Sequence, residues 1–322
     1  MEEANVIIGD ASMKRILTLT MNPSIDLSTS VEYVMPDRKL HCQSLQREPG
    51  GGGINVSRVI HRLGGVSIAL FPAGGHAGQM LQNLLDQEGI KYHPIPIEGW
   101  TRENFMILEE ATSQQFRFGM PGPPLYESEW EHCLNEILSI DPKPDYVVAS
   151  GSLPPGVPKD FYALLSQKVK NLRGRLILDA SGEELRLAIE TGVYLLKPNM
   201  RELGELAGKE IKDEPHQKEV AINTVKRGPC EVVVVSLGAG GAWMVTKEGC
   251  ERIHAPIVPV KSKVGAGDSM VAGIVLSLAQ GKSLREAVRF GVAAGAAAVM
   301  TPGTELCRRE DVQKLYMGMV SQ

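Results

Sequence analysis

The sequence reads VGAGDSM at residues 264–270, where three small residues lead directly into an apolar helix pattern. The pattern is formed by Met270, Val271, Ile274, Val275 and Leu278. Bare backbone N–H groups at Gly265, Ala266 and Gly267 can approach a phosphate closely, and the dipole of the helix adds to the attraction. Asp268 beside this anion hole is placed to take the proton of an attacking hydroxyl during phosphoryl transfer. The alternative is that Asp268 only caps the helix.

A second glycine stretch, EPGGGGIN at residues 48–55, precedes another amphipathic helix pattern. That pattern consists of Val56, Val59, Ile60 and Leu63. Gly51 and Gly52 can bring bare backbone against a ligand, and the Asn55 amide can bond sugar hydroxyls as donor or as acceptor. A flexible loop is the alternative. A linker would not need four glycines directly before a helix, however, because ordering them costs chain entropy.

A third stretch, KPNMRE at residues 197–202, follows a strand-like run and begins a helix. Asn199 and Glu202 lie three residues apart, so both can face one point and orient water on a Mg²⁺ ion that bridges phosphates. The alternative is a capping box, in which Asn199 is the N-cap and Glu202 its partner. Lys197 at the strand end and Asn199 are assigned to ATP binding.

Two further loops follow strand-like runs. The loop SLGAGGA begins at Ser236, and we assign ATP binding to Ser236, Gly238 and Gly241 because backbone amides of such a loop can hold a nucleotide. A glycine-rich hairpin turn is the alternative. The loop SGSLPPG at residues 150–156 contains Ser152 and ends another strand, where α/β sheets bind their ligands. Its alternative is a rigid turn.

Apolar runs typical of buried strands recur along the chain, with helical patterns between most of them. The runs are 16–19, 66–70, 146–149, 176–178, 194–196 and 232–235. Strands that alternate with helices indicate a parallel sheet covered on both faces. Residues 27–48 and 100–120 instead predict exposed antiparallel strands of a small second sheet, which would serve as a lid or a dimer surface or be a decorative hairpin. We expect one domain over residues 13–322, after an extension of residues 1–12 to which we assign no function.

Composition excludes several classes of protein. The formal net charge of −4 gives no basic footprint for nucleic acid or an anionic membrane. The five cysteines form neither a CxxC pair nor a disulfide framework, as expected for reduced thiols of a cytosolic protein. The N-terminus is acidic where a secretory signal is basic, and no apolar run is long enough to cross a bilayer. We therefore expect a cytoplasmic protein with no membrane segment. A dehydrogenase and a P-loop NTPase are excluded because neither GxGxxG nor GxxxxGK[ST] is present.

Together and in this order, the five motifs resemble those of the ribokinase-like, or PfkB, family of carbohydrate kinases, and the resemblance runs from about residue 16 to the end of the chain. It implies a three-layer α/β/α core with a mainly parallel sheet and a small antiparallel β lid. It also implies ATP as phosphoryl donor, Asp268 as base, the anion hole at Gly265 to Gly267, and Asn199 with Glu202 as the pair that orients Mg²⁺.

Within the family, the segment NPSID that ends at Asp26 resembles the hexose-phosphate kinases, with Asp26 placed to accept hydrogen bonds from sugar hydroxyls. Arg102 matches the position that binds the phosphate of the substrate, which suits a forked guanidinium. Lys39 resembles a lid lysine that supplements this site, including from a partner subunit, and a homodimer through the lid is the implied assembly. The uninterrupted glycine run resembles the 6-phosphofructokinase branch, so we expect fructose 6-phosphate as acceptor.

Several alternatives remain at this point. Tagatose 6-phosphate and fructose 1-phosphate stay open as acceptors, since few contacts separate epimers and regioisomers. A nucleoside kinase would leave Arg102 and Lys39 without a phosphate to bind, and a non-catalytic sugar-phosphate sensor would be expected to lose Asp268. Lys263 stands where relatives commonly have threonine, in a loop associated with monovalent-cation binding, so this departure puts the carry-over of potassium activation in doubt. Our hypothesis is that the Lys263 ammonium lies near the place of the cation; a lysine pointing into solvent is the alternative.

Overall fold

The computed structural model of the chain describes residues 13–208, 211, 213–227 and 230–320. The expected extension of residues 1–12 lies outside the described residues. The predicted apolar runs form strands of one nine-stranded sheet with the order β13-β12-β11-β10-β9-β8-β1-β4-β5. Its strands are β1 (Ile16–Leu19), β4 (Ile68–Ala73), β5 (Lys91–Pro96), β8 (Tyr146–Ser150), β9 (Arg175–Asp179), β10 (Leu195–Leu196), β11 (Val232–Ser236), β12 (Ala242–Val245) and β13 (Cys250–Ile253). All pairs from β5 to β11 are parallel, and β12 runs antiparallel to both of its neighbours.

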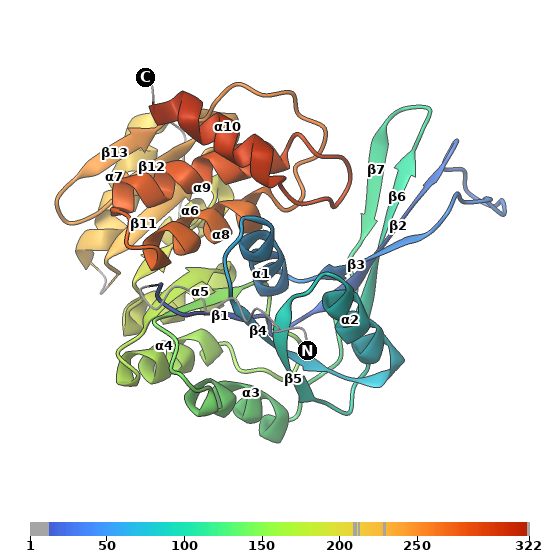
Figure 1. Cartoon of the computed structure of the whole chain (residues 1–322), viewed down its shortest axis with the longest axis horizontal. Helices are drawn as coiled ribbons and strands as arrows, with labels where there is room; N and C mark the ends of the chain where they lie inside the picture. Colours follow the sequence, from blue (N-terminus) through green and yellow to red (C-terminus); the bar gives the residue numbers. More distant parts are fainter. Residues whose placement is uncertain (1–12, 209–210, 212, 228–229, 321–322) are drawn as a thin grey trace, which may run out of the picture.

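Helices cover both faces of this sheet, because successive strand residues point to opposite sides. In β1, Ile16 packs with one layer and Leu17 with the other. The first layer contains α1 (Gly52–Arg62), α8 (Ala266–Ala279), α9 (Leu284–Ala298) and α10 (Arg309–Val320). The second contains α3 (Glu127–Ser139), α4 (Phe161–Asn171), α5 (Gly182–Thr191), α6 (Met200–Ala207) and α7 (Glu214–Arg227). The expected three-layer α/β/α core is confirmed (Figure 1).

A separate four-stranded sheet, called the lid sheet here, projects from the core beside α2 (Gly75–Gln87) (Figure 1). Its order is β3 (Gln46–Gly50), β2 (Ser24–Val31), β6 (Arg102–Glu109) and β7 (Gln114–Phe118). The outer pairs β2–β3 and β6–β7 are antiparallel as expected, but the central pair β2–β6 is parallel. This departure follows from the connections, because β2 and β6 continue from the parallel core strands β1 and β5 and so leave the core in the same direction. Ile25 and Leu27 of β2 pack against α2, which holds the base of the lid sheet on the core.

Among the described residues, no helix combines the length and the apolar character needed to cross a membrane.

Candidate active site

The two glycine-bearing helix starts converge. The Asn55 amide near the start of α1 donates a hydrogen bond of 2.9 Å from Nδ2 to Oδ2 of Asp268 in the first turn of α8. The N-cap of α8 is Gly265, with φ of 70°, and no side chain caps this helix. Asp268 therefore does not act as a cap. Its carboxylate faces another helix, and no described side chain accepts a hydrogen bond from the first-turn N–H groups of α8, so these groups can form an anion hole.

The glycine run packs against neighbouring backbone and does not act as a loose linker. A Cβ on Gly50 would lie 2.4 Å from Ser24 Oγ, and one on Gly52 would lie 2.2 Å from Ser150 Oγ. Gly51 has φ of 110°, a conformation that other residues rarely adopt. These close approaches fix the start of α1 between the lid sheet and the end of β8, which places Asn55 opposite Asp268.

An ion pair lies beside Asp268 at the carboxyl ends of β9 and β10. Lys197 is 5% exposed, and its Nζ lies 3.1 Å from Oδ1 of Asp179. The backbone of Gly267 is adjacent, because a Cβ there would contact both side chains at 3.4 and 3.9 Å. Sequence reasoning missed Asp179. The available signal was its place directly after the predicted strand of residues 176–178, at the sheet edge where ligands bind.

Burial and neighbouring charges set the protonation of Asp268. Burial raises its pKa to about 6, and the negative charges of Asp179 and Asp26 act in the same direction. The hydrogen bond from Asn55 and the positive charge of Lys197 oppose this rise. Burial also disfavours the charged Lys197, but the carboxylates around it, Asp179 foremost, keep its pKa above the ordinary value. A carboxyl group with a pKa near 6 is suited to accept a proton at neutral pH.

Asn199 and Glu202 form the capping box that was weighed as the alternative to a metal role. Asn199 Oδ1 accepts from the Glu202 N–H at 3.0 Å, and Glu202 Oε2 accepts from the Asn199 N–H at 2.8 Å. Glu202 nevertheless lies within the electrostatic reach of Asp179 and Lys197, and burial raises its pKa. No cluster of three or more possible metal-binding acidic, His or Cys side chains occurs in the described part of the chain. Because Mg²⁺ keeps several waters and needs only one or two carboxylates, the half-buried Glu202 fits such an ion through its second oxygen.

Ser236 lies beside this helix start. Its N–H donates to the Pro198 carbonyl at 2.9 Å, which brings the end of β11 next to the segment after Lys197. The following residues form a 3-10 turn, Gly238–Gly240, between β11 and β12, so the hairpin-turn alternative is correct about the local structure. Gly241 approaches β13 closely, because a Cβ there would lie 2.0 Å from the Ile253 carbonyl oxygen. Gly238 is exposed, and a Cβ added to it would meet no described atom within 4 Å.

Polar side chains of the lid sheet form the other side of the site. Asp26 Oδ1 accepts from Ser24 Oγ at 2.8 Å and from Asn104 Nδ2 at 2.9 Å. Arg102 donates to two backbone carbonyl oxygens, those of Asn22 and Met120. Burial lowers the pKa of Arg102, and the Asp26 charge opposes this.

Two buried polar atoms near these lid-sheet side chains have no hydrogen-bond partner in the described residues, namely Arg102 Nε and Asn22 Oδ1. Asn22 Nδ2 donates to Ser152 Oγ at 3.3 Å, which connects the predicted Ser152 to the same place. A buried donor or acceptor without a partner costs free energy. Both atoms therefore keep unsatisfied hydrogen-bonding capacity in this structure.

Two predicted lysines are not brought to this site. Lys39 is exposed in the loop between β2 and β3, at the far end of the lid sheet. Lys263 is also exposed, and its side chain makes no hydrogen bond or ion pair to another described residue, as the alternative of a lysine pointing into solvent expects. The adjacent Ser262 is buried and donates to the Gly303 carbonyl at 2.7 Å.

The fold and this site are those of a sugar kinase. The chain belongs to the pfkB family of carbohydrate kinases, whose family model matches residues 17–311. It is 47% identical over 307 residues to an ATP-dependent 6-phosphofructokinase isozyme 2 of Mycobacterium tuberculosis, covering 95% of this chain and 90% of the relative. It is 43% identical to the isozyme 2 of Escherichia coli, covering 94% and 98%, and 33% identical to a 1-phosphofructokinase of Bacillus subtilis, covering 93% and 97%.

Solved structures agree with these relatives. The crystal structure of phosphofructokinase-2 from Escherichia coli in complex with fructose-6-phosphate has a TM-score of 0.90 and 42% identity, covering 96% of this chain and all of the other. The likeness to the 6-phosphofructokinase branch that we expected from the glycine run is confirmed, and the 1-phosphofructokinases are more distant.

Proposed function

We propose that this protein transfers the γ-phosphoryl group of ATP to fructose 6-phosphate and forms fructose 1,6-bisphosphate. The observation that carries the proposal is the half-buried Asp268 carboxylate, held by Asn55 beside the uncapped start of α8. The high identity to relatives named ATP-dependent 6-phosphofructokinase supports this acceptor over other hexose phosphates.

Each residue of the site has a separate role in an in-line transfer of the phosphoryl group. Asp268 accepts the proton of the sugar hydroxyl as that oxygen bonds to phosphorus and the bond from phosphorus to the ADP oxygen breaks. The N–H groups at Gly265, Ala266 and Gly267 hold the equatorial oxygens. Lys197 supplies positive charge toward the phosphates. Mg²⁺, when bound near Glu202 and Asn199, would neutralise phosphate charge.

The nucleotide lies, in this proposal, along the strand ends from Lys197 to β11. Ser236 adjoins the Lys197 segment, and Gly238 and Gly241 themselves add no side chain to the next turn. This assignment follows the family resemblance, since the turn by itself is an ordinary hairpin.

The sugar phosphate occupies the side formed by the lid sheet. Asp26 and Asn104 receive the sugar hydroxyls, and the positive charge of the Arg102 guanidinium holds its phosphate. Gly51 and Gly52 let the sugar approach the start of α1, and Ser152 closes the site beside Asn22. A neutral nucleoside would leave Arg102 without its anion.

We also propose that the lid sheet forms the interface of a homodimer and that Lys39 reaches the phosphate of the neighbouring subunit. Large apolar side chains are exposed along this sheet and its loops, as a protein interface would need. They are Tyr33, Met35, Phe105, Phe118 and Met120, each at least 40% exposed. Sedimentation velocity of wild type and Phe118→Glu would test the assembly: a monomeric wild type would contradict it.

The test of the proposed function is an ADP-release assay with fructose 6-phosphate, fructose 1-phosphate, tagatose 6-phosphate and adenosine, followed by NMR of the product. We expect the highest kcat/KM with fructose 6-phosphate and phosphorylation at C1. A preference for adenosine would instead indicate a nucleoside kinase, and absence of turnover with all four would favour a sensor. Arg102→Ala should raise KM for fructose 6-phosphate by about 10-fold or more, since a charged hydrogen bond is lost.

A further inference from the structure

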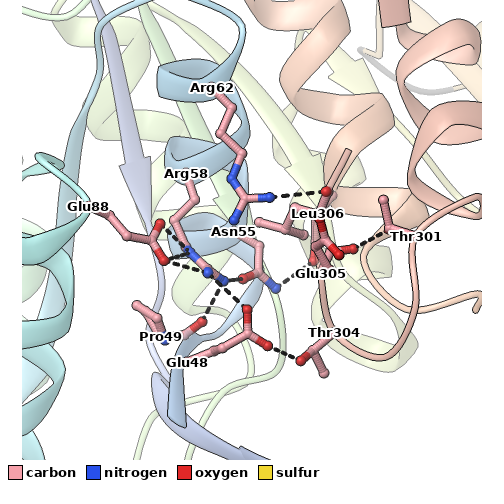
Figure 2. Close-up of polar contacts among 11 residues, drawn as sticks. Glu48, Pro49, Asn55, Arg58, Arg62, Glu88, Thr301, Thr304, Glu305 and Leu306 are labelled. Atoms are coloured by element: carbon pink, nitrogen blue, oxygen red, sulfur yellow. Dashed lines mark hydrogen bonds and ion pairs between the residues drawn. The ribbon is translucent and has the colours of Figure 1, made fainter. Parts of the chain in front are cut away.

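One buried cation lies one turn beyond Asn55 on α1. The Arg58 side chain is 2% exposed, and all three guanidinium nitrogens donate hydrogen bonds (Figure 2). Nε and Nη2 donate to the Glu88 carboxylate at 2.6 to 3.0 Å. Nη2 also reaches Glu48 at 3.3 Å, and Nη1 donates to the Pro49 carbonyl at 2.9 Å. Arg58 thus fixes the end of α2 and the lid strand β3 against α1.

The same guanidinium contacts the amide that holds the candidate base. Arg58 Nη1 lies 3.4 Å from Asn55 Oδ1 (Figure 2). Asn55 Nδ2 donates to Asp268 at 2.9 Å. A carboxamide has an acceptor at one end and a donor at the other. Turning it over would set its NH₂ group against the Arg58 cation and its oxygen against the Asp268 carboxylate. Arg58 therefore selects the orientation in which Asn55 donates to Asp268.

Stability alone does not explain this cluster. A buried ion pair gains little net free energy over an apolar packing of the same volume, because desolvation offsets the attraction. The cluster joins separate elements instead, because Glu48 of β3 also accepts from Thr304 in the loop after α9. Arg58 sits where the lid, α2 and that loop meet the site.

We propose that Arg58 is a positioning residue of the phosphoryl transfer: held by Glu88 and Glu48, it fixes the direction of the Asn55 amide so that its NH₂ group faces Asp268. The proposal rests on the proposed function for its catalytic consequence, because the amide matters to rate only where Asp268 is the base. The other charged groups that face Asp268, namely Asp26, Asp179 and Lys197, make no hydrogen bond or ion pair with Arg58.

The first test compares Arg58→Met with Arg62→Met. Arg62 lies one turn further along α1 and, within the described part of the chain, donates to the Leu306 carbonyl alone, at 3.0 Å, so it is a matched control without contact to Asn55. We expect Arg58→Met to lower kcat by about 10- to 100-fold, as small displacements of reacting groups do, with KM for both substrates within about threefold. Arg62→Met should retain kcat. Equal kcat values for Arg58→Met and wild type would overturn the proposal.

A double-mutant cycle separates positioning from general damage. In an Asn55→Ala background, Arg58→Met should lower kcat by less than about threefold, because its effect passes through the missing amide. Losses that multiply independently would show a merely structural role and overturn the proposal. If Arg58→Met does not fold, Arg58→Met/Glu88→Met removes the unpaired carboxylate as well and takes its place in the same cycle.

A readout without substrates separates this proposal from the proposed function. The side-chain ¹⁵NH₂ signals of Asn55 in the unliganded protein are assigned by their absence in Asn55→Ala. Arg58→Met should shift them and speed their exchange with water, while Arg62→Met leaves them in place. Unchanged signals would show that Arg58 does not orient the Asn55 amide, whichever sugar is the acceptor of the phosphoryl group, and would overturn the proposal. A shift in a protein that phosphorylates none of the sugars would uphold the orientation and reject the proposed function.

Discussion

The starts of α8 and α6 lie side by side at the site, yet their first turns are completed in different ways. At α6, Asn199 and Glu202 satisfy each other's backbone N–H groups in a closed capping box. At α8, Gly265 offers no side chain, and Asp268 bonds to Asn55 on another helix. The capping box satisfies two N–H groups at the start of α6, whereas the uncapped start of α8, with a half-buried acid, leaves its first N–H groups open to an anionic ligand and is the better candidate for the chemistry. The experiments below test this contrast.

The largest effect is expected at the acid of the uncapped start. Asp268→Asn should lower kcat by at least about 100-fold, because an amide cannot accept the proton, while the Kd for ATP changes little. Single-turnover kinetics and ATP titration measure the two quantities. Comparable kcat values for variant and wild type would remove Asp268 from the role of base.

The two helix ends also offer a matched pair of glycines. Gly265 at the start of α8 and Gly208 at the end of α6 both adopt left-handed φ angles, 70° and 61°. Alanine at either position should destabilise the fold by about 1 to 2 kcal/mol. Only Gly265→Ala should also lower kcat, by roughly 10-fold, since its Cβ would lie 2.6 Å from Leu306 and displace the anion hole. Thermal unfolding and steady-state rates check both, and equal rates in the two variants would contradict the contrast.

The capping box at the start of α6 has a matched control in the capping box at the start of α9. Glu202→Gln weakens the α6 box, and Glu286→Gln weakens the similar box at the start of α9. If Glu202 also orients water on Mg²⁺, only Glu202→Gln should raise the Mg²⁺ concentration for half-maximal rate, by about 10-fold. The same Mg²⁺ dependence in Glu202→Gln and wild type would leave Glu202 with the capping role alone.

The pH dependence gives the smallest expected effect. Because Asp268 acts deprotonated and its pKa is about 6, kcat/KM should rise with pH up to about 6 and level off above it. Its folded pKa lies above the ordinary 3.8, so the folded state loses stability on this account as pH rises from about 4 to 6. Asp268→Asn should therefore melt at a higher temperature than wild type at pH 7. The pH dependence of kcat/KM checks the first expectation, and calorimetry checks the second. A lower melting temperature for Asp268→Asn than for wild type at pH 7 would contradict the raised pKa of Asp268.

Sequence reasoning located the elements of the site better than the contacts among them. The strand runs, the two glycine-bearing helix starts and the lid segments were predicted because hydrophobic periodicity and glycine clusters are local signals. The parallel pairing of β2 with β6 was missed, since residue alternation is the same in parallel and antiparallel exposed strands. Asp179 was missed because one acidic residue after a strand is not distinctive until Lys197 is found 3.1 Å away.

By itself, the sequence determined which residues could do chemistry here: small residues and an acid at one helix start, and glycines and an amide at another. These motifs also determined the family to which the chain belongs. Tertiary structure alone decided that Asp268 faces Asn55 and does not cap its own helix, and that Arg58 lies behind that amide. The physical reason is that backbone propensity acts over a few residues. Burial, pKa and hydrogen-bond direction depend instead on groups that are 213 residues apart in the chain, as Asn55 and Asp268 are.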